Sequence, residues 1–408
     1  MYLIDFNKPV HIHFIGIGGI SMSGLAELLI SKNFTVSGSD NKESVLTRQL
    51  AAAGCRIFIG QSADNIDSTI DAAVYTAAIH PDNPEYDRCI KLGIPMLTRA
   101  ELLGQVMTNY RTAIGVSGTH GKTTVTSMLA YIMIKAGLDP TVMVGGKLDG
   151  IDGNLRIGKS EYFLTETCEY MRNFLKFFPT AAVILNVEAD HLDYYKDIDD
   201  IIDAFHDFAM LVPEDGFIAV NGGSKNAMKA VGGARAKVCT FGFENADFTA
   251  EDISFSRYGY PSFEIHAEGE KLFDVTLSVV GIHNVLNATA ASLAASKMGI
   301  DPKCIKEGLE AFHGTKRRFE KKGFVNGALV IDDYAHHPTE IEATLNAIEN
   351  IDHNRVWCIF QPHTYTRTYN LLGDFAKVLS RAGNVILTDI YAAREKDTGL
   401  VSSRQLAE

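Results

Sequence analysis

The sequence predicts an α/β protein with three domains, each built on a mainly parallel sheet. Apolar, β-branched runs alternate with helical patterns along most of the chain, as in proteins with parallel sheets. Glycine-rich turns follow two of these runs and lead directly into helices. The length of 408 residues exceeds what one hydrophobic core holds, because cores stop growing near ~250 residues. Two or three domains are therefore expected.

The amino-acid composition argues against four classes of protein: nucleic-acid-binding, zinc-binding, disulfide-rich and membrane-spanning. The hydrophobic fraction of 46% and the charged fraction of 22% are typical of folded globular proteins. A formal net charge of -12 argues against broad contact with nucleic acid, which requires clustered Lys and Arg. The six cysteines include no C-x-x-C pair, so neither a zinc site nor a disulfide framework is predicted. The apolar run from Val10 to Ile17 is too short to span a bilayer, and we expect a cytoplasmic protein without a membrane partner.

The first domain is predicted over residues 1–108. The apolar run Val10–Ile15 leads through glycines into a helical pattern, which indicates a strand, a tight turn and a helix. Further strands are predicted at Phe34–Ser37 and Ala72–Tyr75. This alternation favours a parallel sheet.

The second domain is predicted over residues 109–315. It opens with a strand at Thr112–Ser117, a glycine loop and a helix through Ala136. Apolar runs at Tyr162–Leu164 and Ala181–Leu185 indicate buried parallel strands of the same sheet. Short alternating stretches with turns between Phe248 and Val280 predict a hairpin-rich insert, which a helix from Val285 to Met298 follows.

The third domain is predicted over residues 316–408, again with a parallel α/β layout. Its strands are expected at Leu329–Ile331, Val356–Phe360 and Val385–Leu387. The sequence ends within a helical pattern that has no stop signal, so we expect this domain to be incomplete.

The strongest motif is a glycine loop between a predicted strand and a predicted helix. Glycines let backbone N–H groups converge on phosphate oxygens, Lys122 can reach the β and γ phosphates, and Thr123 can ligate Mg²⁺. The spacing departs from the strict phosphate-loop form, because Val116 stands in place of the first glycine. The alternative is a plain glycine turn. The residues of the loop are Gly118, Thr119, His120, Gly121, Lys122, Thr123 and Thr124.

A second glycine turn follows the first strand and is a weaker signal. Ser21 replaces the third glycine of the dinucleotide fingerprint, so we favour another pyrophosphate compound such as a UDP-sugar over NAD. A purely structural turn is the alternative. The candidate binding residues are Gly16, Gly18, Gly19, Ile20, Ser39 and Asp40.

Polar side chains follow several other predicted strands. Glu166 and His191 come after two strands of the second domain, where they can complete Mg²⁺ sites beside the phosphate loop; alone, each is more often a solvated loop residue. Asn284 and Asn287 share a helix face and can read an adenine edge, with helix capping by Asn284 as the alternative. In the third domain, polar clusters at 332–338 and 361–367 follow two strands and indicate a further site.

With these residues assembled, the chain resembles the Mur ligases, the family that builds the peptide stem of bacterial cell-wall precursors. The match covers the whole chain and is closest to members that add L-alanine. The segments that carry it are GIGGISMSGLA (16–26), GTHGKTT (118–124), NVEADHLD (186–193), HNVLNA (283–288), DDYAHHPTE (332–340) and QPHTYTR (361–367).

The resemblance implies ATP-dependent ligation of L-alanine to the lactyl carboxylate of UDP-N-acetylmuramate in peptidoglycan synthesis, through an acyl phosphate. It implies a Rossmann-like UDP-sugar-binding domain, a central P-loop ATPase domain and a C-terminal Rossmann-like domain that binds the amino acid. The cofactors implied are ATP and Mg²⁺, and the oligomeric state, monomer or dimer, is left open.

The resemblance also implies roles for single residues. Lys122, Glu166 and His191 would be catalytic, and Thr123 would join Glu166 and His191 in holding metal. Besides the phosphate loop, the ATP-binding residues would be Asn284, Asn287, Arg318, Asp333 and His336. The amino-acid pocket would contain Tyr334, His336, His363 and Arg367.

Two departures from the family pattern bear on activity. Thr364 stands where some relatives carry Arg, so recognition of the amino-acid carboxylate would rest on Arg367. Relatives also continue for several dozen residues. The rival functions are a nicotinamide-dependent dehydrogenase, which leaves the Gly-Lys-Thr loop unexplained, and a nucleotide-regulated binding protein, which does not need the third-domain pocket. Within the family, the rival is a ligase that adds a whole peptide.

Overall fold

The computed structural model describes residues 2–76, 78–148, 153–393, 395–397 and 399–408. These residues form two compact units, each made of several segments. The first unit comprises Met1–Gly115, Asp139–Thr167 and Arg172–Ala181, and the second comprises Val116–Leu138, Cys168–Met171 and Ala182–Glu408.

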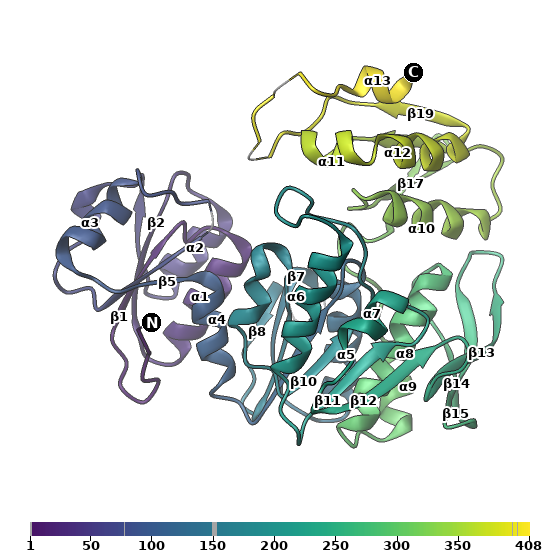
Figure 1. The fold of residues 1–408 in the computed structure, drawn as a ribbon, viewed down its shortest axis with the longest axis horizontal. Helices are drawn as coiled ribbons and strands as arrows, with labels where there is room; N and C mark the ends of the chain where they lie inside the picture. Colours follow the sequence, from purple (N-terminus) through teal and green to yellow (C-terminus); the bar gives the residue numbers. More distant parts are fainter. Residues whose placement is uncertain (1, 77, 149–152, 394, 398) are drawn as a thin grey trace. The chain divides into compact units, whose positions relative to one another are not determined.

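A five-stranded parallel sheet forms the N-terminal part of the first unit (Figure 1). The strand order is β3-β2-β1-β4-β5, and the central strand pairs His11 with Thr35 on one side and Ile12 with Ala72 on the other. The parallel sheet predicted for residues 1–108 is therefore confirmed. Its strands are β1 (His11–Ile15), β2 (Thr35–Asp40), β3 (Arg56–Ile59), β4 (Ala72–Tyr75) and β5 (Met96–Thr98). Its helices are α1 (Ile20–Ser31), α2 (Val45–Ala52), α3 (Pro84–Leu92) and α4 (Arg99–Met107).

The glycine turn that follows β1 packs tightly against β2. A Cβ atom at Gly38 would lie 2.6 Å from the Cδ1 atom of Ile17 and 2.8 Å from the carbonyl oxygen of Phe14. Gly16 has φ of +85°, a conformation that L side chains rarely adopt. Glycine is thus needed at position 38 because a side chain would not fit, and at position 16 because of the backbone conformation.

The second sheet contains ten strands in the order β15-β14-β13-β12-β11-β10-β6-β9-β7-β8. Strands β13, β14 and β15 pair antiparallel, which confirms the predicted hairpin-rich insert. The turn between β14 and β15 contains Glu268 and Gly269 with φ of 51° and 85°, as a tight hairpin requires. The strands are β6 (Thr112–Ser117), β7 (Thr141–Leu148), β8 (Gly153–Arg156), β9 (Tyr162–Glu166), β10 (Ala181–Ile184), β11 (Phe217–Asn221), β12 (Lys237–Gly242), β13 (Phe248–Phe255), β14 (Pro261–Ala267) and β15 (Glu270–Thr276).

Three helices of the second unit pack on one another beside this sheet (Figure 1). A Cβ atom at Gly308 would lie 2.5 Å from the Cα atom of Ile132, so the helices that carry these residues approach closely. The packed helices are α5 (Lys122–Lys135), α8 (Ile282–Lys297) and α9 (Pro302–Glu310). Two further helices are α6 (Ile198–Met210) and α7 (Lys225–Ala230).

The C-terminal part departs from the predicted layout in one strand. The strand expected at Leu329–Ile331 is present, but it pairs antiparallel with a neighbour that the sequence reading missed. The cause is an Asn326-Gly327 turn with φ of 49° and 85°, which closes a hairpin and prevents a parallel crossover at this point. The hairpin strands are β16 (Glu320–Val325) and β17 (Ala328–Asp332).

The remaining two strands of this part are parallel, as predicted, and cover a small core of their own. Phe360 and Phe375 are buried with ring centroids 5.5 Å apart, and Leu345 and Leu379 pack in the same cluster. The strands are β18 (Trp357–Phe360) and β19 (Asn384–Leu387). The helices are α10 (Pro338–Glu349), α11 (Tyr365–Asn370), α12 (Leu372–Leu379) and α13 (Ser403–Ala407).

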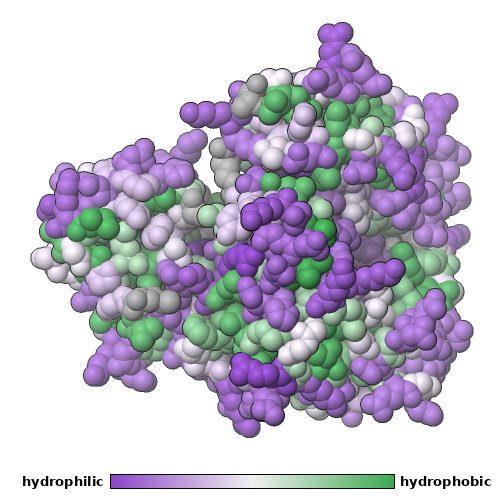
Figure 2. Space-filling view, viewed as in Figure 1, coloured by the Kyte–Doolittle hydropathy of each residue, from purple (hydrophilic) through white to green (hydrophobic). Residues whose placement is uncertain are grey.

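The surface shows no large apolar area on the face drawn in Figure 2, where hydrophilic residues surround small hydrophobic patches. Among the described residues, no helix is both long and apolar enough to cross a membrane. No disulfide joins any of the six cysteines, all of which lie in the described part of the chain.

Candidate functional site

The predicted phosphate loop connects the end of β6 to the start of α5. Gly118 and Gly121 have φ of +144° and +87°, and Gly121 is the N-cap of the helix. A Cβ atom at Gly121 would lie 2.8 Å from Oδ1 of Asn287, and one at Gly118 would lie 2.9 Å from Cβ of Leu185. The two glycines are therefore required for packing of the loop, in addition to any role in binding a ligand. They bring the loop against β10 and α8.

Lys122 occupies the first position of α5, and its ammonium group is held in place. Its Nζ atom lies 3.0 and 3.2 Å from the carboxylate oxygens of Glu169 and donates to the carbonyl oxygens of Thr119, at 3.1 Å, and Gly118. Glu169 is only 3% exposed. Sequence reasoning missed Glu169 as a partner of Lys122. The feature that could have indicated it is its position three residues after Glu166, in the loop that follows β9.

His191 lies close to the same carboxylate. Its Nε2 atom is 3.7 Å from both Glu169 and Asp190, and its ring packs against Tyr170 with centroids 4.7 Å apart. Burial lowers the pKa of His191 from its ordinary value despite the two carboxylates. The residue has φ of 55°, which is uncommon outside glycine. A neutral imidazole beside a buried carboxylate suits a divalent cation.

Two other predicted metal ligands have contacts of their own. Thr123 lies in the first turn of α5, and its carbonyl oxygen accepts a hydrogen bond from Ser127 at 2.7 Å. Glu166 ends β9, and its carboxylate accepts the backbone N–H of Gly145 at 2.6 Å. A hydroxyl and a carboxylate are oxygen donors that Mg²⁺ prefers, so each of these two side chains is a suitable ligand type for the predicted ion.

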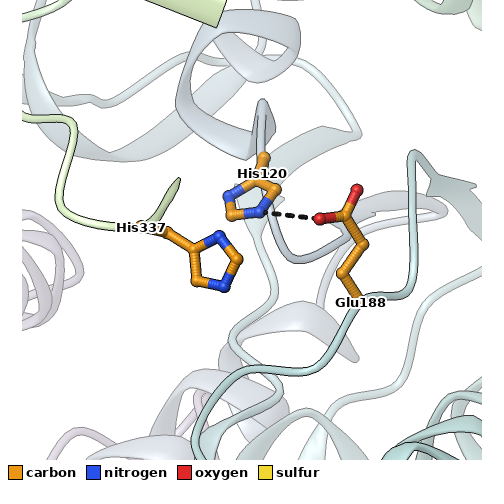
Figure 3. Close-up of side chains that lie close together, drawn as sticks. All are labelled: His120, Glu188 and His337. Carbon is orange, nitrogen blue, oxygen red and sulfur yellow. Dashed lines mark ion pairs between the residues drawn. The ribbon is translucent and has the colours of Figure 1, made fainter. Parts of the chain in front are cut away.

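A cluster of two histidines and a glutamate lies beside the phosphate loop (Figure 3). The ligand-type atoms of His120, Glu188 and His337 all lie within 4.8 Å of one another. Both nitrogens of His337 are used by the backbone: Nδ1 accepts from Thr339 at 3.3 Å, and Nε2 lies 3.3 Å from the carbonyl oxygen of Ala189. His337 is thus the N-cap of α10, which leaves little capacity for a metal.

His120 acts as a charged bridge in this cluster. Its Nε2 atom lies 3.3 Å from Glu188, the contact drawn in Figure 3, and its Nδ1 atom lies 3.2 Å from Glu340. Burial opposes the charge, but hydrogen bonds to the two carboxylates outweigh it and raise the pKa of His120 to about 9. We interpret the cluster as an imidazolium between two carboxylates, which connects the phosphate loop to α10.

A cavity of about 150 Å³ lies within the second unit where three of the predicted amino-acid-binding residues meet. His336, His363 and Arg367 line it together with Asp190 and Glu395. The fourth predicted residue, Tyr334, does not line it. Its ring lies 5.4 Å from that of His336 and is covered by the guanidinium groups of Arg317 and Arg318 at 4.7 and 5.5 Å.

Arg367 is the best-defined side chain of this cavity. It is paired with Asp190, and its Nη1 atom lies 3.1 Å from Nδ1 of His363. Burial alone would raise the pKa of Asp190, but its interactions with neighbouring His191, including the backbone N–H of that residue, and the charge of Arg367 lower the pKa well below its ordinary range. Thr364, the N-cap of α11, has φ of 67°, an outlier for a β-branched residue. Such strain is typical of functional sites.

The side chains predicted to bind adenine form hydrogen bonds within the protein. The side chain of Asn284 donates to the carbonyl oxygen of Val280 at 2.8 Å and accepts from Asn287 at 3.0 Å. The alternative that Asn284 caps α8 is wrong, because Gly281 occupies the N-cap position.

Asp333 and Arg318 are engaged by neighbouring groups of the chain. The carboxylate of Asp333 accepts the N–H groups of Phe319 and Ala335 at 3.0 and 2.8 Å and the hydroxyl of Thr344 at 3.1 Å. Arg318 lies 3.8 Å from Glu340.

A second pocket of about 490 Å³ lies at the carboxyl ends of β1, β2, β3 and β4. Gly16, Gly19 and Asp40, which were predicted to bind the UDP-sugar, line it, and the N–H of Gly18 donates to Asp40 at 2.8 Å. Ser39 lies beneath the glycine turn and is fully buried. Ile20 is 45% exposed at the start of α1.

Sequence reasoning missed six polar residues that line this second pocket. They follow β2, β3 and β4 and are Asn41, Gln61, Thr76, His80, Asp82 and Asn83. Each lies beyond a strand end, which is where parallel sheets place ligand-binding loops.

Models of one protein family match three successive segments of the chain. Residues 11–111 match the Mur ligase family catalytic domain, 116–295 the Mur ligase middle domain, and 317–408 the Mur ligase, glutamate ligase domain. The UDP-N-acetylmuramate--L-alanine ligases of Lachnospira eligens and Agathobacter rectalis are 53% and 54% identical to the chain. Each alignment covers 100% of this chain and 89% of the relative.

Solved structures of related proteins share the fold. The UDP-N-acetylmuramate-alanine ligase from Thermotoga maritima superposes with a TM-score of 0.80 at 32% identity, over 93% of this chain and 85% of that one. A murein peptide ligase from Psychrobacter arcticus gives a TM-score of 0.75 at 29% identity, over 93% and 84%. The phosphate loop, the two pockets and these matches lead to one conclusion: the chain belongs to the Mur ligase family and has its three-domain α/β fold.

Proposed function

We propose that this protein uses ATP to join L-alanine to the lactyl carboxylate of UDP-N-acetylmuramate. The observation that carries the proposal is the presence of three separate ligand sites. A phosphate loop with an anchored lysine, a small cavity with a buried arginine, and a larger pocket at the glycine turn match a nucleotide, an amino acid and a UDP-sugar. The names of the relatives at 53% and 54% identity contain two of these substrates, UDP-N-acetylmuramate and L-alanine.

The chemistry requires the carboxylate to be activated, because a carboxylate is a poor electrophile toward an amine. A carboxylate oxygen attacks the γ-phosphorus of ATP in line, the new O–P bond forms, and the bond to ADP breaks. The amine of L-alanine then attacks the acyl carbon, loses a proton, and expels phosphate. Positioning and charge neutralisation supply most of the rate.

In this proposal the residues of the phosphate loop bind ATP, and Lys122 neutralises the β and γ phosphates. Thr123, Glu166 and His191 would hold Mg²⁺, which would neutralise the negative charge of the phosphates. Arg367 would bind the carboxylate of L-alanine, since a guanidinium fork matches a carboxylate. Asn284 and Asn287 are the proposed contacts of adenine.

The size of the amino-acid cavity favours a single residue over a peptide. Pockets that bind drug-sized ligands have volumes of roughly 300 Å³ or more, whereas the volume of this cavity is about 150 Å³. The peptide-adding rival, to which the Psychrobacter arcticus structure is relevant, is therefore the less favoured function.

The experiment measures ADP release with UDP-N-acetylmuramate and Mg²⁺ present. We expect ADP release to depend on an added amino acid and to be faster with L-alanine than with L-serine or glycine. A preference for a peptide that begins with L-alanine over free L-alanine would replace the proposal with the peptide-adding function. ADP release that does not depend on UDP-N-acetylmuramate would reject both the alanine-adding and the peptide-adding function.

Domain boundaries and location follow the same proposal. We place the UDP-sugar domain at 1–108, the ATP domain at 109–315 and the amino-acid domain at 316–408; the order of the three family-model segments, 11–111, 116–295 and 317–408, supports this division. A cytoplasmic location is proposed because ATP and UDP-sugars are cytoplasmic metabolites and the six cysteines form no disulfide within the described chain.

A further inference from the structure

Glu85 is a fully buried carboxylate in the first turn of α3, outside every site predicted from the sequence. Its Oε2 atom accepts the hydroxyl of Ser39 at 2.5 Å, and its Oε1 atom accepts the side-chain amide of Asn65 at 2.6 Å. The Nε2 atom of His13, also fully buried, lies 3.7 Å away. Each oxygen therefore has a polar partner.

A buried carboxylate is costly unless it is fully paired. Burial raises the pKa of Glu85, but His13, Ser39 and Asn65 lower it by more, so the net pKa lies below its ordinary value. The group is ionised at neutral pH, and its partners are fixed by charge-assisted hydrogen bonds.

Two of the partners of Glu85, Ser39 and Asn65, also hold loops that border the second pocket. The carbonyl oxygen of Ser39 accepts the N–H groups of Gly16 and Ile17, both at 2.9 Å, and so fixes the glycine turn after β1. Asn65 also donates to the carbonyl oxygen of Gly60 at 3.0 Å. This bond fixes the segment that follows β3.

The remaining two loops are connected through the same region. The N–H of Gly60 donates to the carbonyl oxygen of Asp40 at 2.8 Å, which joins the segments after β2 and β3. Asn83 caps α3 by accepting the N–H of Glu85 at 2.9 Å, and its amide donates to Gln61 at 2.6 Å. Asp40, Gln61 and Asn83 all line the pocket.

The far side of Glu85 is held by a chain of buried polar groups. His13 Nδ1 lies 2.9 Å from the hydroxyl of Ser37, which lies 2.8 Å from Nε2 of His11. This chain crosses β1 and β2 behind the pocket. It supports Glu85 without reaching the ligand side.

We infer that Glu85 is a positioning residue for the UDP-sugar, whose buried carboxylate fixes the four strand-end loops of the pocket against one another. The inference rests on the proposed function, because it assigns the pocket to the UDP-sugar. Glu85 does not line the pocket, so it acts only through the loops.

The test compares Glu85→Gln, which keeps the shape, with Glu85→Ala and Asn65→Ala. Calorimetric binding of UDP and steady-state kinetics are measured for each variant. We expect Glu85→Gln to weaken UDP binding and raise the KM for the UDP-sugar about tenfold, as loss of charge-assisted hydrogen bonds predicts. Asn65→Ala should cause a smaller change in the same direction. The KM for ATP should stay within about twofold of wild type.

A matched control separates positioning from general destabilisation. Gln105 is also a buried polar residue of the first unit, and it binds Ile4 and Tyr2 of the N-terminal segment at 2.8 and 2.9 Å. Gln105→Ala should lower the melting temperature without changing UDP binding. Equal effects of Glu85→Gln on the KM values of UDP-sugar and ATP, or unchanged UDP binding in both Glu85→Gln and Asn65→Ala, would overturn the inference. A wild-type protein that binds no UDP would instead reject the proposed function.

Discussion

The guanidinium of Arg367 donates to Oδ1 of Asp190 from two of its nitrogens, Nε at 3.1 Å and Nη2 at 3.0 Å, and Nη2 also donates to Oδ2 at 3.4 Å. Both side chains are at least nine-tenths buried. Asp190 comes from the loop after β10 and Arg367 from α11, so the pair joins two walls of the small cavity. A third nitrogen, Nη1, contacts His363.

Arg367→Ala should raise the KM for L-alanine about 10- to 100-fold while the KM for ATP changes little. The physical reason is the loss of a charge-assisted bond to the substrate carboxylate. Steady-state kinetics with each substrate varied in turn provide the measurement. Arg381→Ala is the matched control, because Arg381 pairs with Glu342 and Glu349 on the surface. Equal changes in both KM values would place Arg367 at the nucleotide instead.

Lys122→Ala should abolish turnover and also cost stability. The substitution leaves Glu169 buried without its cation, which costs roughly 3–5 kcal/mol. The double variant Lys122→Ala/Glu169→Gln should recover much of the unfolding free energy but none of the activity. Urea unfolding and ADP release test the two effects. Lys135→Ala, in the last turn of the same helix, should behave like wild type. Turnover near wild type in Lys122→Ala would contradict the ATP-site assignment.

The bridge from His120 to Glu188 and Glu340 should make stability depend on pH. The folded-state pKa of about 9 exceeds the ordinary value of 6.5, so the proton contributes its full stability below about pH 6.5. This contribution is lost as the pH rises through 9. Between pH 6.5 and 10, the unfolding free energy of wild type should fall about 3 kcal/mol more than that of His120→Gln.

Urea unfolding at several pH values measures this difference. Arg318 and His336 also face Glu340, at 3.8 and 3.2 Å, so the comparison with His120→Gln isolates the part that belongs to His120. His313→Gln, a change at an exposed histidine of the same unit, should retain the wild-type pH dependence. Parallel curves for wild type and His120→Gln would show that His120 carries no proton in the folded state.

An oxygen label tests the proposed chemistry. ¹⁸O placed in the lactyl carboxylate should appear in released phosphate, because the carboxylate oxygen that attacks phosphorus leaves with it. His191→Ala should slow this transfer by weakening the hold on a metal ion. Mass spectrometry of the phosphate provides the measurement. Label found only in the peptide product would rule out an acyl phosphate.

Local patterns in the sequence were sufficient to predict the phosphate loop and most strands. The Gly-Lys-Thr segment and its flanking strand and helix lie within 24 residues, so one stretch of sequence contains the whole motif. The Asn326-Gly327 hairpin was also readable, but the apolar run that follows it was assigned to a parallel strand instead.

The polar partners in the sites could not be predicted because they come from distant segments. Glu169 meets Lys122 across 47 residues, and Asp190 meets Arg367 across 177. Glu85 meets Ser39 across 46 residues and has no motif of its own. Contacts between such distant polar side chains depend on the order of strands in the sheet and on burial. The periodicity of apolar residues in the sequence reveals neither.

The hairpin insert leaves β15 at one end of the ten-stranded sheet, where its outer backbone groups have no neighbouring strand in the order found. Such an edge can template pairing with another polypeptide. Glu270, Lys271 and Asp274 are exposed along this strand, and Lys271 and Asp274 are held by ion pairs with Glu264 at 2.5 Å and Lys306 at 3.0 Å. A second polypeptide approaching the edge would have to strip water from these charges before any strand pairing began. The charged side chains of β15 therefore oppose strand pairing at the edge that the insert creates.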